Sequence, residues 1–177
     1  MEILEQTFLD NSFQDWLTAG GVALLAVLFL RLLQAVFHRR LSRLAARTST
    51  KWDDHVVGMI AGTKLLFLLV AGLAVGSTLL DLPEPAARAS RIVFMVALLI
   101  QTGLWGRSLI ASVLDDYYRR SMDDNPADAT TLSVINFAAQ TVLWSVVLLL
   151  VLDNLGINIT ALVAGLGLSL IHISEPT

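Results

Sequence analysis

The chain has 177 residues, of which 55% are hydrophobic and only 15% are charged. A soluble domain carries about 25% charged residues, so this composition indicates an integral membrane protein. Because the chain contains no cysteine, a disulfide framework and a thiolate metal site are both excluded. The net charge of -3 is distributed over loops and tails without a sustained basic face, so we expect no nucleic-acid partner.

The N-terminal segment, residues 1–15, is acidic. It contains Glu2, Glu5, Asp10 and Asp15 and has no Lys or Arg. A secretory signal begins with a basic region, so we expect an external segment here and not a signal peptide.

Four apolar stretches approach the roughly 20 residues that a helix needs to cross a bilayer. The second of these stretches is Leu65–Leu80. We expect its helix to begin earlier, near Val56, with Lys64 close to an interface or facing protein. A fifth stretch, Ile157–Gly167, is too short to cross alone. The expected fold is all-α, a membrane helical bundle with four complete transmembrane helices and the start of a fifth. The four complete spans are Trp16–Phe37, Leu65–Leu80, Ile92–Leu114 and Val134–Leu152.

Lys and Arg residues are concentrated in two of the expected loops, which predicts the orientation of the helices. The loop after the first span carries five of them from Arg39 to Lys51, and the loop after the third span carries Arg119 and Arg120. The second loop carries two, and neither the N-terminal segment nor the turn Asp153–Asn158 carries any. We therefore expect a multi-pass protein of the inner (plasma) membrane, with its N-terminus outside and its fifth helix running inward.

Proline and threonine residues predict where two helices begin. The segment Leu82–Pro85 contains two prolines, which cannot continue a helix, and we expect a short external turn there. Thr130 or Thr131, which follow Asp128, can cap the fourth helix by accepting hydrogen bonds from free backbone N–H groups.

The segment Trp52–His55 precedes the second helix. A metal site needs three or four ligands, and no partner cluster is visible, so we expect no metal. Asp53 or Asp54 is instead expected to cap the helix and to offset its N-terminal dipole. Aromatic residues near the ends of spans are expected to act as interfacial anchors. These anchors are Trp16, Trp52, Tyr117 and Tyr118.

Polar side chains occur inside two of the spans, at Gln101 and Thr102 and at Asn136 and Gln140. Such side chains usually face other helices and hydrogen-bond to them. A transport pathway is the alternative, and it is less favoured because no Asp, Glu or His lies mid-span to relay protons. No P-loop, nucleophile elbow or zinc motif is present, so we expect neither an enzyme nor a cofactor.

The segment 125–167 contains the most informative pattern. It begins Asn-Pro-Ala-Asp, continues through the fourth span and the turn Asp-Asn-Leu-Gly, and ends in the sequence INITALVAGLG. Small residues at helical spacing let one membrane helix approach another closely. The order of these parts resembles the small-conductance mechanosensitive channel (MscS-like) family, and the number of spans fits its larger, five-span branch. The pore-helix packing candidates are Ala161, Ala164, Gly165 and Gly167.

The resemblance implies a subunit of a tension-gated ion channel that releases ions and small solutes on hypo-osmotic shock. It implies a homo-oligomer, most often a heptamer, with membrane lipids as further partners and a C-terminal domain in the cytoplasm. Residues 16–124 would form the lipid-facing paddle, and residues 125–167 the fourth span and the start of the pore helix. The alternative is a non-conducting membrane protein, such as a transporter subunit or a helical scaffold.

The last ten residues, Leu168–Thr177, break the pattern of small residues. Their sequence LSLIHISEPT resembles a translated transposase sequencing adapter. We therefore expect a non-native tail, with the natural sequence departing from this chain near Gly167. The gate of the family lies further along the pore helix, so this chain alone is not expected to conduct.

Overall fold

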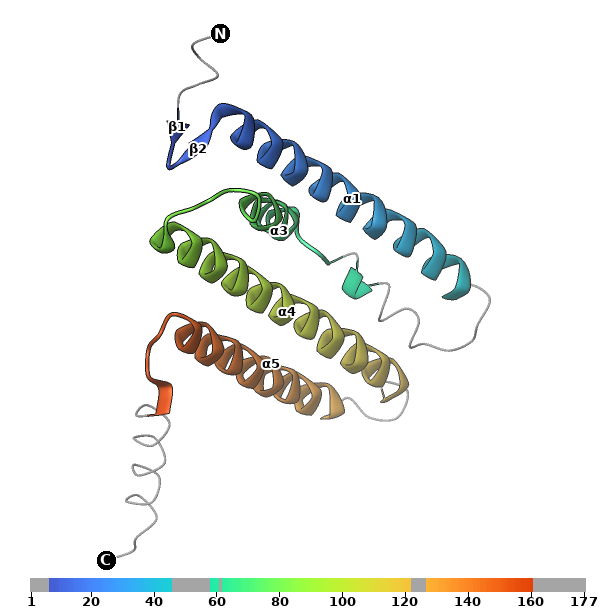
Figure 1. The fold of residues 1–177 in the computed structure, drawn as a ribbon. Helices are drawn as coiled ribbons and strands as arrows, with labels where there is room; N and C mark the ends of the chain where they lie inside the picture. The colour runs from blue at the N-terminus through green and yellow to red at the C-terminus, as the bar shows by residue number, and fades with distance from the viewer. Residues whose placement is uncertain (1–6, 46–57, 61, 122–126, 161–177) are drawn as a thin grey trace, which may run out of the picture.

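The structure is a computed structural model that describes residues 7–45, 58–60, 62–121 and 127–160 (Figure 1). The helices α1, α3, α4 and α5 stand side by side in this order and form a row, in which each helix packs mainly against its sequence neighbours. A small hairpin of two strands precedes α1. The elements are β1 (Thr7–Phe8), β2 (Asn11–Ser12), α1 (Phe13–Ala45), α3 (Leu65–Ser77), α4 (Glu84–Ser121) and α5 (Ala127–Asn154).

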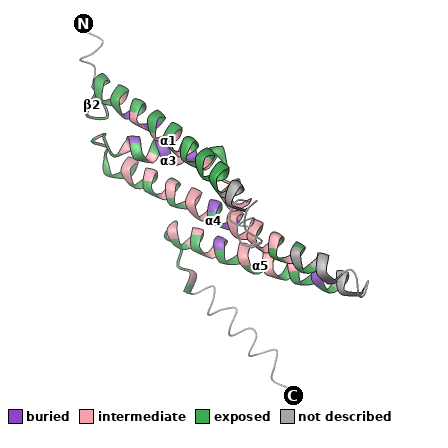
Figure 2. Cartoon of the chain, turned by 90° about the vertical axis from the view of Figure 1, so that its right-hand side faces the viewer, coloured by how far each residue is buried: buried purple, intermediate pink, exposed green. Residues whose placement is uncertain are grey.

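Three of these helices are long and apolar enough to span a membrane, over Phe13–Arg40, Glu84–Asp115 and Thr131–Asn154. This agrees with the expected helical membrane protein. Few of the described residues are buried, and apart from Asn11 in the hairpin they lie on the helices, mostly where one helix faces another (Figure 2). Large apolar side chains such as Leu66 and Phe137 are instead exposed, as they are on helices whose outer surface meets lipid.

The expected second span is interrupted. Helix α3 has 13 residues, which gives a length of about 20 Å against the roughly 30 Å of a bilayer core. Residues 58–60 form a separate helical turn, and Lys64 before α3 is extended, with φ −77° and ψ 143°. The prediction of one continuous helix from near Val56 to Leu80 is therefore wrong, although Val56 itself lies outside the described residues.

The sequence predicted where α4 and α5 begin, and the structure departs from the prediction for α5. The turn before α4 is confirmed at Leu82 and Pro83, but Glu84 and Pro85 already belong to the helix. The carbonyl of Pro83 accepts bonds from the N–H groups of Ala86 and Ala87, so the helix begins directly after Pro83. The predicted cap at Thr130 or Thr131 is wrong, because α5 already begins at Ala127. Alanine has the highest helix propensity, so Ala127 and Ala129 favour a start ahead of the cap signal at the two threonines.

The hairpin before α1 was not expected from the sequence. Leu9 and Asp10 both have positive φ, at 53° and 61°, as the two central residues of a type I′ turn require. Ser12 then caps α1: its hydroxyl accepts a bond from the Asp15 N–H, and the Asp15 carboxylate accepts one from the Ser12 N–H at 2.8 Å. This reciprocal pairing is a capping box, which sets the first turn of the helix.

Asn11 attaches this hairpin to the turn between α3 and α4. Its side chain is 3% exposed, donates to the carbonyl of Asp81 at 3.0 Å and accepts from the Asp81 N–H at 2.8 Å. The hairpin, the end of α3 and the start of α4 therefore lie together at one end of the row, which we call the Pro83 end (Figure 1).

Candidate functional site: the interrupted helix and the turn after α5

Helices α1 and α3 are in backbone contact. A Cβ added to Gly72 would lie 2.7 Å from the Ala23 carbonyl oxygen, and one added to Gly76 would lie 2.6 Å from the Ala19 carbonyl oxygen. The sequence Gly72-Leu-Ala-Val-Gly76 thus faces Ala19 and Ala23, two small residues with the same spacing on α1. Close approach between small residues is a common basis of helix association in membranes.

The gap between the turn at 58–60 and α3 is held by side chains from a neighbouring helix. Gln101, in the middle of α4 and 1% exposed, accepts a bond from the Lys64 N–H at 3.0 Å and donates to the Gly62 carbonyl at 3.3 Å. One turn further along α4, the indole N–H of Trp105 donates to the Thr63 hydroxyl at 3.2 Å. Backbone that leaves a helix inside a membrane requires such partners, because lipid supplies none.

A third side chain reaches the same gap from α1. The Gln34 amide nitrogen donates to the carbonyl oxygens of Ile60, at 3.0 Å, and Thr63, at 3.4 Å. The Gln34 side-chain oxygen is buried and has no hydrogen-bond partner among the described residues. Amide groups from two helices therefore satisfy both sides of the interruption, and together with Trp105 they form what we call the amide clamp (Gln34, Gln101 and Trp105).

Lys64 lies beside the middle of α4, because its N–H is bonded to Gln101, which comes 17 residues after the first residue of that helix. Its side chain is exposed. The alternative that it faces protein is therefore wrong within the described part of the chain. A long flexible lysine can still carry its ammonium group toward an interface along the apolar surface.

The turn after α5 is closed by two backbone bonds and one side-chain bond. Ile157 N–H donates to the Leu152 carbonyl and Gly156 N–H to the Asp153 carbonyl, at 3.0 and 2.9 Å. With Gly156 at φ 83°, this is the Schellman arrangement, in which a left-handed residue ends a helix. The Asn158 side chain then accepts the Thr160 N–H at 3.0 Å, as the N-cap of a helix does. Helical backbone resumes at Ile159.

We expect Gly156→Ala to destabilise this turn by about 1 kcal/mol, because a residue with a Cβ is strained at positive φ. No atom lies within 4 Å of the added methyl group, so the effect comes from the backbone alone. The measurement is the free energy of unfolding in detergent or bicelles. Gly20→Ala is the control, because its added methyl group is equally free but lies within α1. Equal stability of the two variants would contradict the assignment of the turn.

The sequence-predicted site residues lie in different parts of the chain. Trp16 is half-buried in the first turns of α1, and Tyr117 is 61% exposed near the far end of α4. Tyr118 belongs to α4, but the position of its side chain is not described. Their role as interfacial anchors stays a prediction. Several other expected features lie outside the described residues: the anchor Trp52, the capping segment Asp53–His55, the pore-helix candidates Ala161, Ala164, Gly165 and Gly167, and the tail Leu168–Thr177.

The polar residues predicted to face other helices behave in two ways. Gln101 does so through the amide clamp, as expected. Asn136 and Gln140 bond to each other along α5 at 2.9 Å, and the Thr102 hydroxyl bonds to the Leu98 carbonyl of its own helix. Sequence reasoning missed Gly72 and Gly76, although a Gly-xxx-Gly pattern inside an apolar segment is a usable signal for helix contact.

Within the described residues, no group of three or more His, Asp or Glu side chains is placed to hold a metal ion. In comparisons with known proteins, no family model, curated protein or solved structure gives a significant match. The class of protein is therefore inferred from the sequence and structure of the chain alone. Its three long apolar helices are consistent with a helical membrane protein.

Proposed function

We propose that this chain is the transmembrane part of a tension-gated channel subunit of the MscS-like type, in the plasma membrane with its N-terminus outside. The observation that carries the proposal is the turn after α5. Helix α5, which is long and apolar enough to span a membrane, ends at Asn154. The chain then turns through Gly156, and helical backbone resumes at Ile159 after the cap at Asn158. In the family that the sequence resembles, the pore helix starts in this position.

The shape of the described part is compatible with a sensor of membrane tension. The helices form a row and not a closed ring (Figure 1), so a pore would require several copies of the chain. Their exposed apolar side chains offer lipid a large contact area. If the open assembly occupies more membrane area than the closed one, tension shifts the population toward the open state in proportion to that difference.

A second candidate function is supported by the amide clamp. Interrupted helices whose free backbone groups are satisfied inside the protein are typical of secondary transporters. A transporter subunit would use the interruption at Gly62–Lys64 as part of a binding site, and a channel subunit would not need it. A non-conducting helical scaffold is a further alternative, which no observation specifically favours.

Patch-clamp recording separates these functions. We expect the protein to give tension-activated currents when it is expressed, with the continuation of the pore helix that the family resemblance implies after Gly167, in a host that lacks its own mechanosensitive channels. Gly165→Val should change the tension threshold or the conductance, because a branched side chain prevents close helix approach. Val163→Leu is the control and should leave both nearly unchanged. Absence of any tension-activated current would exclude the channel and favour a non-conducting role.

A further inference from the structure

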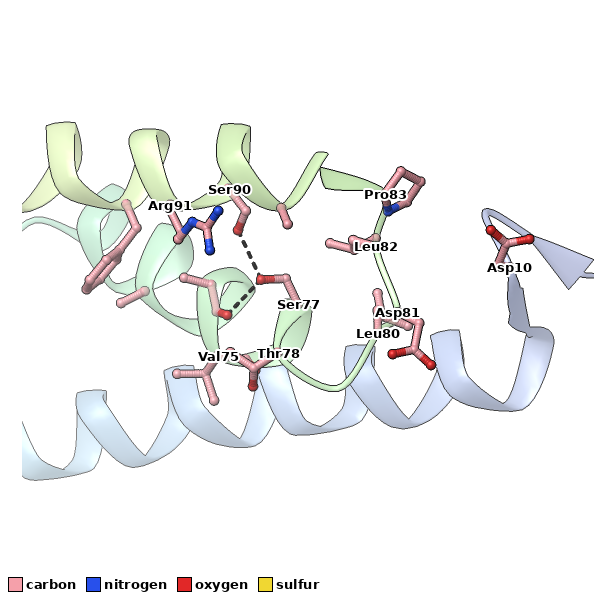
Figure 3. A pocket seen from close by; sticks show the side chains of 14 residues that line it. Asp10, Val75, Ser77, Thr78, Leu80, Asp81, Leu82, Pro83, Ser90 and Arg91 are labelled. Atoms are coloured by element: carbon pink, nitrogen blue, oxygen red, sulfur yellow. Dashed lines mark hydrogen bonds between the residues drawn. The ribbon is translucent and has the colours of Figure 1, made fainter. Parts of the chain in front are cut away.

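A cavity of about 760 Å³ lies between α3 and α4 at the Pro83 end (Figure 3). Its volume falls within the roughly 300–1,000 Å³ typical of sites for small molecules. Small side chains leave room between the two helices, with Ala71 and Ala74 lining the cavity from α3 and Ala87 lining it from α4. A hydrogen bond of 3.0 Å between the Ser77 and Ser90 hydroxyls joins the two helices inside it.

The polarity of the cavity changes along its length. Asp10 and Asp81 lie at the Pro83 end, beyond Leu82 (Figure 3). Arg91 follows on α4, seven residues after Glu84, which places it about 10 Å further along the helix axis. Apolar side chains, among them Ala71 and Phe94, line the deeper part. From the end inward, the charged and aromatic lining residues therefore follow in the order carboxylates, guanidinium and aromatic ring, and Leu80, Leu82 and Pro83 lie beside the carboxylates.

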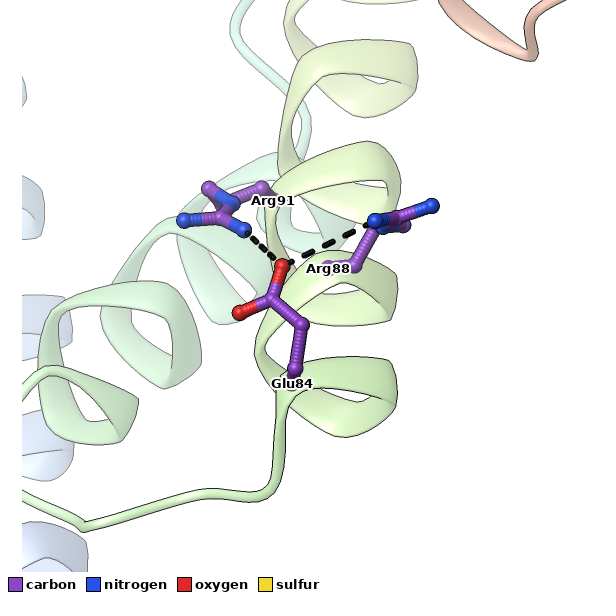
Figure 4. A network of polar contacts seen from close by, with 3 residues as sticks. All are labelled: Glu84, Arg88 and Arg91. Atoms are coloured by element: carbon purple, nitrogen blue, oxygen red, sulfur yellow. Dashed lines mark hydrogen bonds and ion pairs between the residues drawn. The ribbon is translucent and has the colours of Figure 1, made fainter.

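The balance of charged side chains around the cavity does not favour a ligand that carries only negative charge. Glu84 forms ion pairs with Arg91 at 3.2 Å and with Arg88 at 3.8 Å (Figure 4). Both cations pair with Glu84, and the cavity lining adds the carboxylates of Asp10 and Asp81, so the site as a whole carries no excess of positive charge. Arg91 can bind a phosphate group. The carboxylates that line the Pro83 end of the cavity favour a ligand that also carries a cation.

We propose that this cavity binds a phospholipid with a primary-amine zwitterionic headgroup, of the phosphatidylethanolamine type. Its ammonium group donates hydrogen bonds to Asp10 and Asp81, its phosphate binds Arg91, and one acyl chain occupies the apolar space between α3 and α4. The order of groups in such a lipid, from amine to phosphate to hydrocarbon, is the order of groups along the cavity. A trimethylammonium headgroup has no N–H to donate, and an anionic glycerol headgroup has no cation. The proposal requires only that the helices lie in a bilayer, and it does not depend on channel activity.

The test is lipid retention by the full chain, measured by native mass spectrometry. Purified protein is equilibrated with phosphatidylethanolamine, phosphatidylcholine or phosphatidylglycerol carrying identical acyl chains. We expect the ethanolamine lipid to be retained best. Arg91→Gln should weaken that retention about tenfold, the size expected for one lost charge-assisted hydrogen bond. Asp10→Asn combined with Asp81→Asn should remove the preference over the choline lipid.

Arg88→Gln is the matched control. Arg88 has the same type of side chain on the same helix, pairs with the same Glu84 and is equally exposed at 69%, but it does not line the cavity. The Arg88→Gln variant should retain the ethanolamine lipid within about twofold of the wild type.

If the Arg91 variant does not fold, a second variant tests the site. Ala74→Leu fills the hydrocarbon part of the cavity and should lower retention of all three lipids. Equal losses in both arginine variants, or preferred retention of phosphatidylglycerol or of phosphatidylcholine, would overturn the proposal.

Discussion

Replacing Gly72 by alanine is expected to push α3 away from α1 and to lower the free energy of unfolding by about 1–3 kcal/mol. The new Cβ would overlap a methyl carbon of Val27 and would lie 2.7 Å from the carbonyl oxygen of Ala23. Neither neighbour can easily move away, because valine is stiff at its first side-chain torsion and the carbonyl belongs to the helix backbone. The clash must therefore be relieved by separating the two helices.

Gly21→Ala is the control, and it is expected to change the free energy of unfolding in the opposite direction. An added Cβ at Gly21 meets no atom within 4 Å, so the higher helix propensity of alanine should stabilise α1 by up to about 1 kcal/mol. Both variants can be compared by unfolding in bicelles and by the efficiency of a disulfide cross-link engineered between α1 and α3. If Gly72→Ala is as stable as the wild type and cross-links equally well, α1 and α3 do not approach as closely as described.

Replacing Gln101 by leucine is expected to open the amide clamp. The substitution leaves the Lys64 N–H and the Gly62 carbonyl without the partner that now satisfies them. An unsatisfied buried polar group costs about 1–3 kcal/mol, and measured values for hydrogen bonds between membrane helices lie at the lower end of that range. We therefore expect a loss of about 1–2 kcal/mol in the free energy of unfolding.

Hydrogen exchange gives a local readout of the same substitution. The Lys64 amide should exchange markedly faster in Gln101→Leu, whereas amides in the middle of α5 should be unaffected. Thr102→Val is the control, since the Thr102 hydroxyl is exposed and bonds only to its own helix. If the Lys64 amide exchanges at the same rate in both variants, Gln101 does not hold the start of α3.

The sequence was a good guide wherever a local signal exists. Apolar length predicted α1, α4 and α5 as membrane helices, although these helices extend two to eight residues beyond the predicted ends. Pro83 and Gly156 marked the two turns correctly, because proline removes a backbone donor and glycine tolerates positive φ regardless of distant neighbours. The start of α5 was placed too late because the cap signal at Thr130 competed with helix-forming alanines before it.

The interruption before α3 was decided by tertiary structure. The sequence from Gly58 to Lys64 reads as the beginning of an apolar helix, and only its glycines weaken that pattern. What makes the extended conformation possible is the amide clamp, whose members come from α1 and α4, at sequence distances of 26 to 42 residues. No local pattern encodes partners that far away. The sequence alone thus determined that the chain forms apolar membrane helices, whereas contacts between helices determined that one of them is broken, because free backbone groups in an apolar surrounding must find their hydrogen-bond partners within the folded protein.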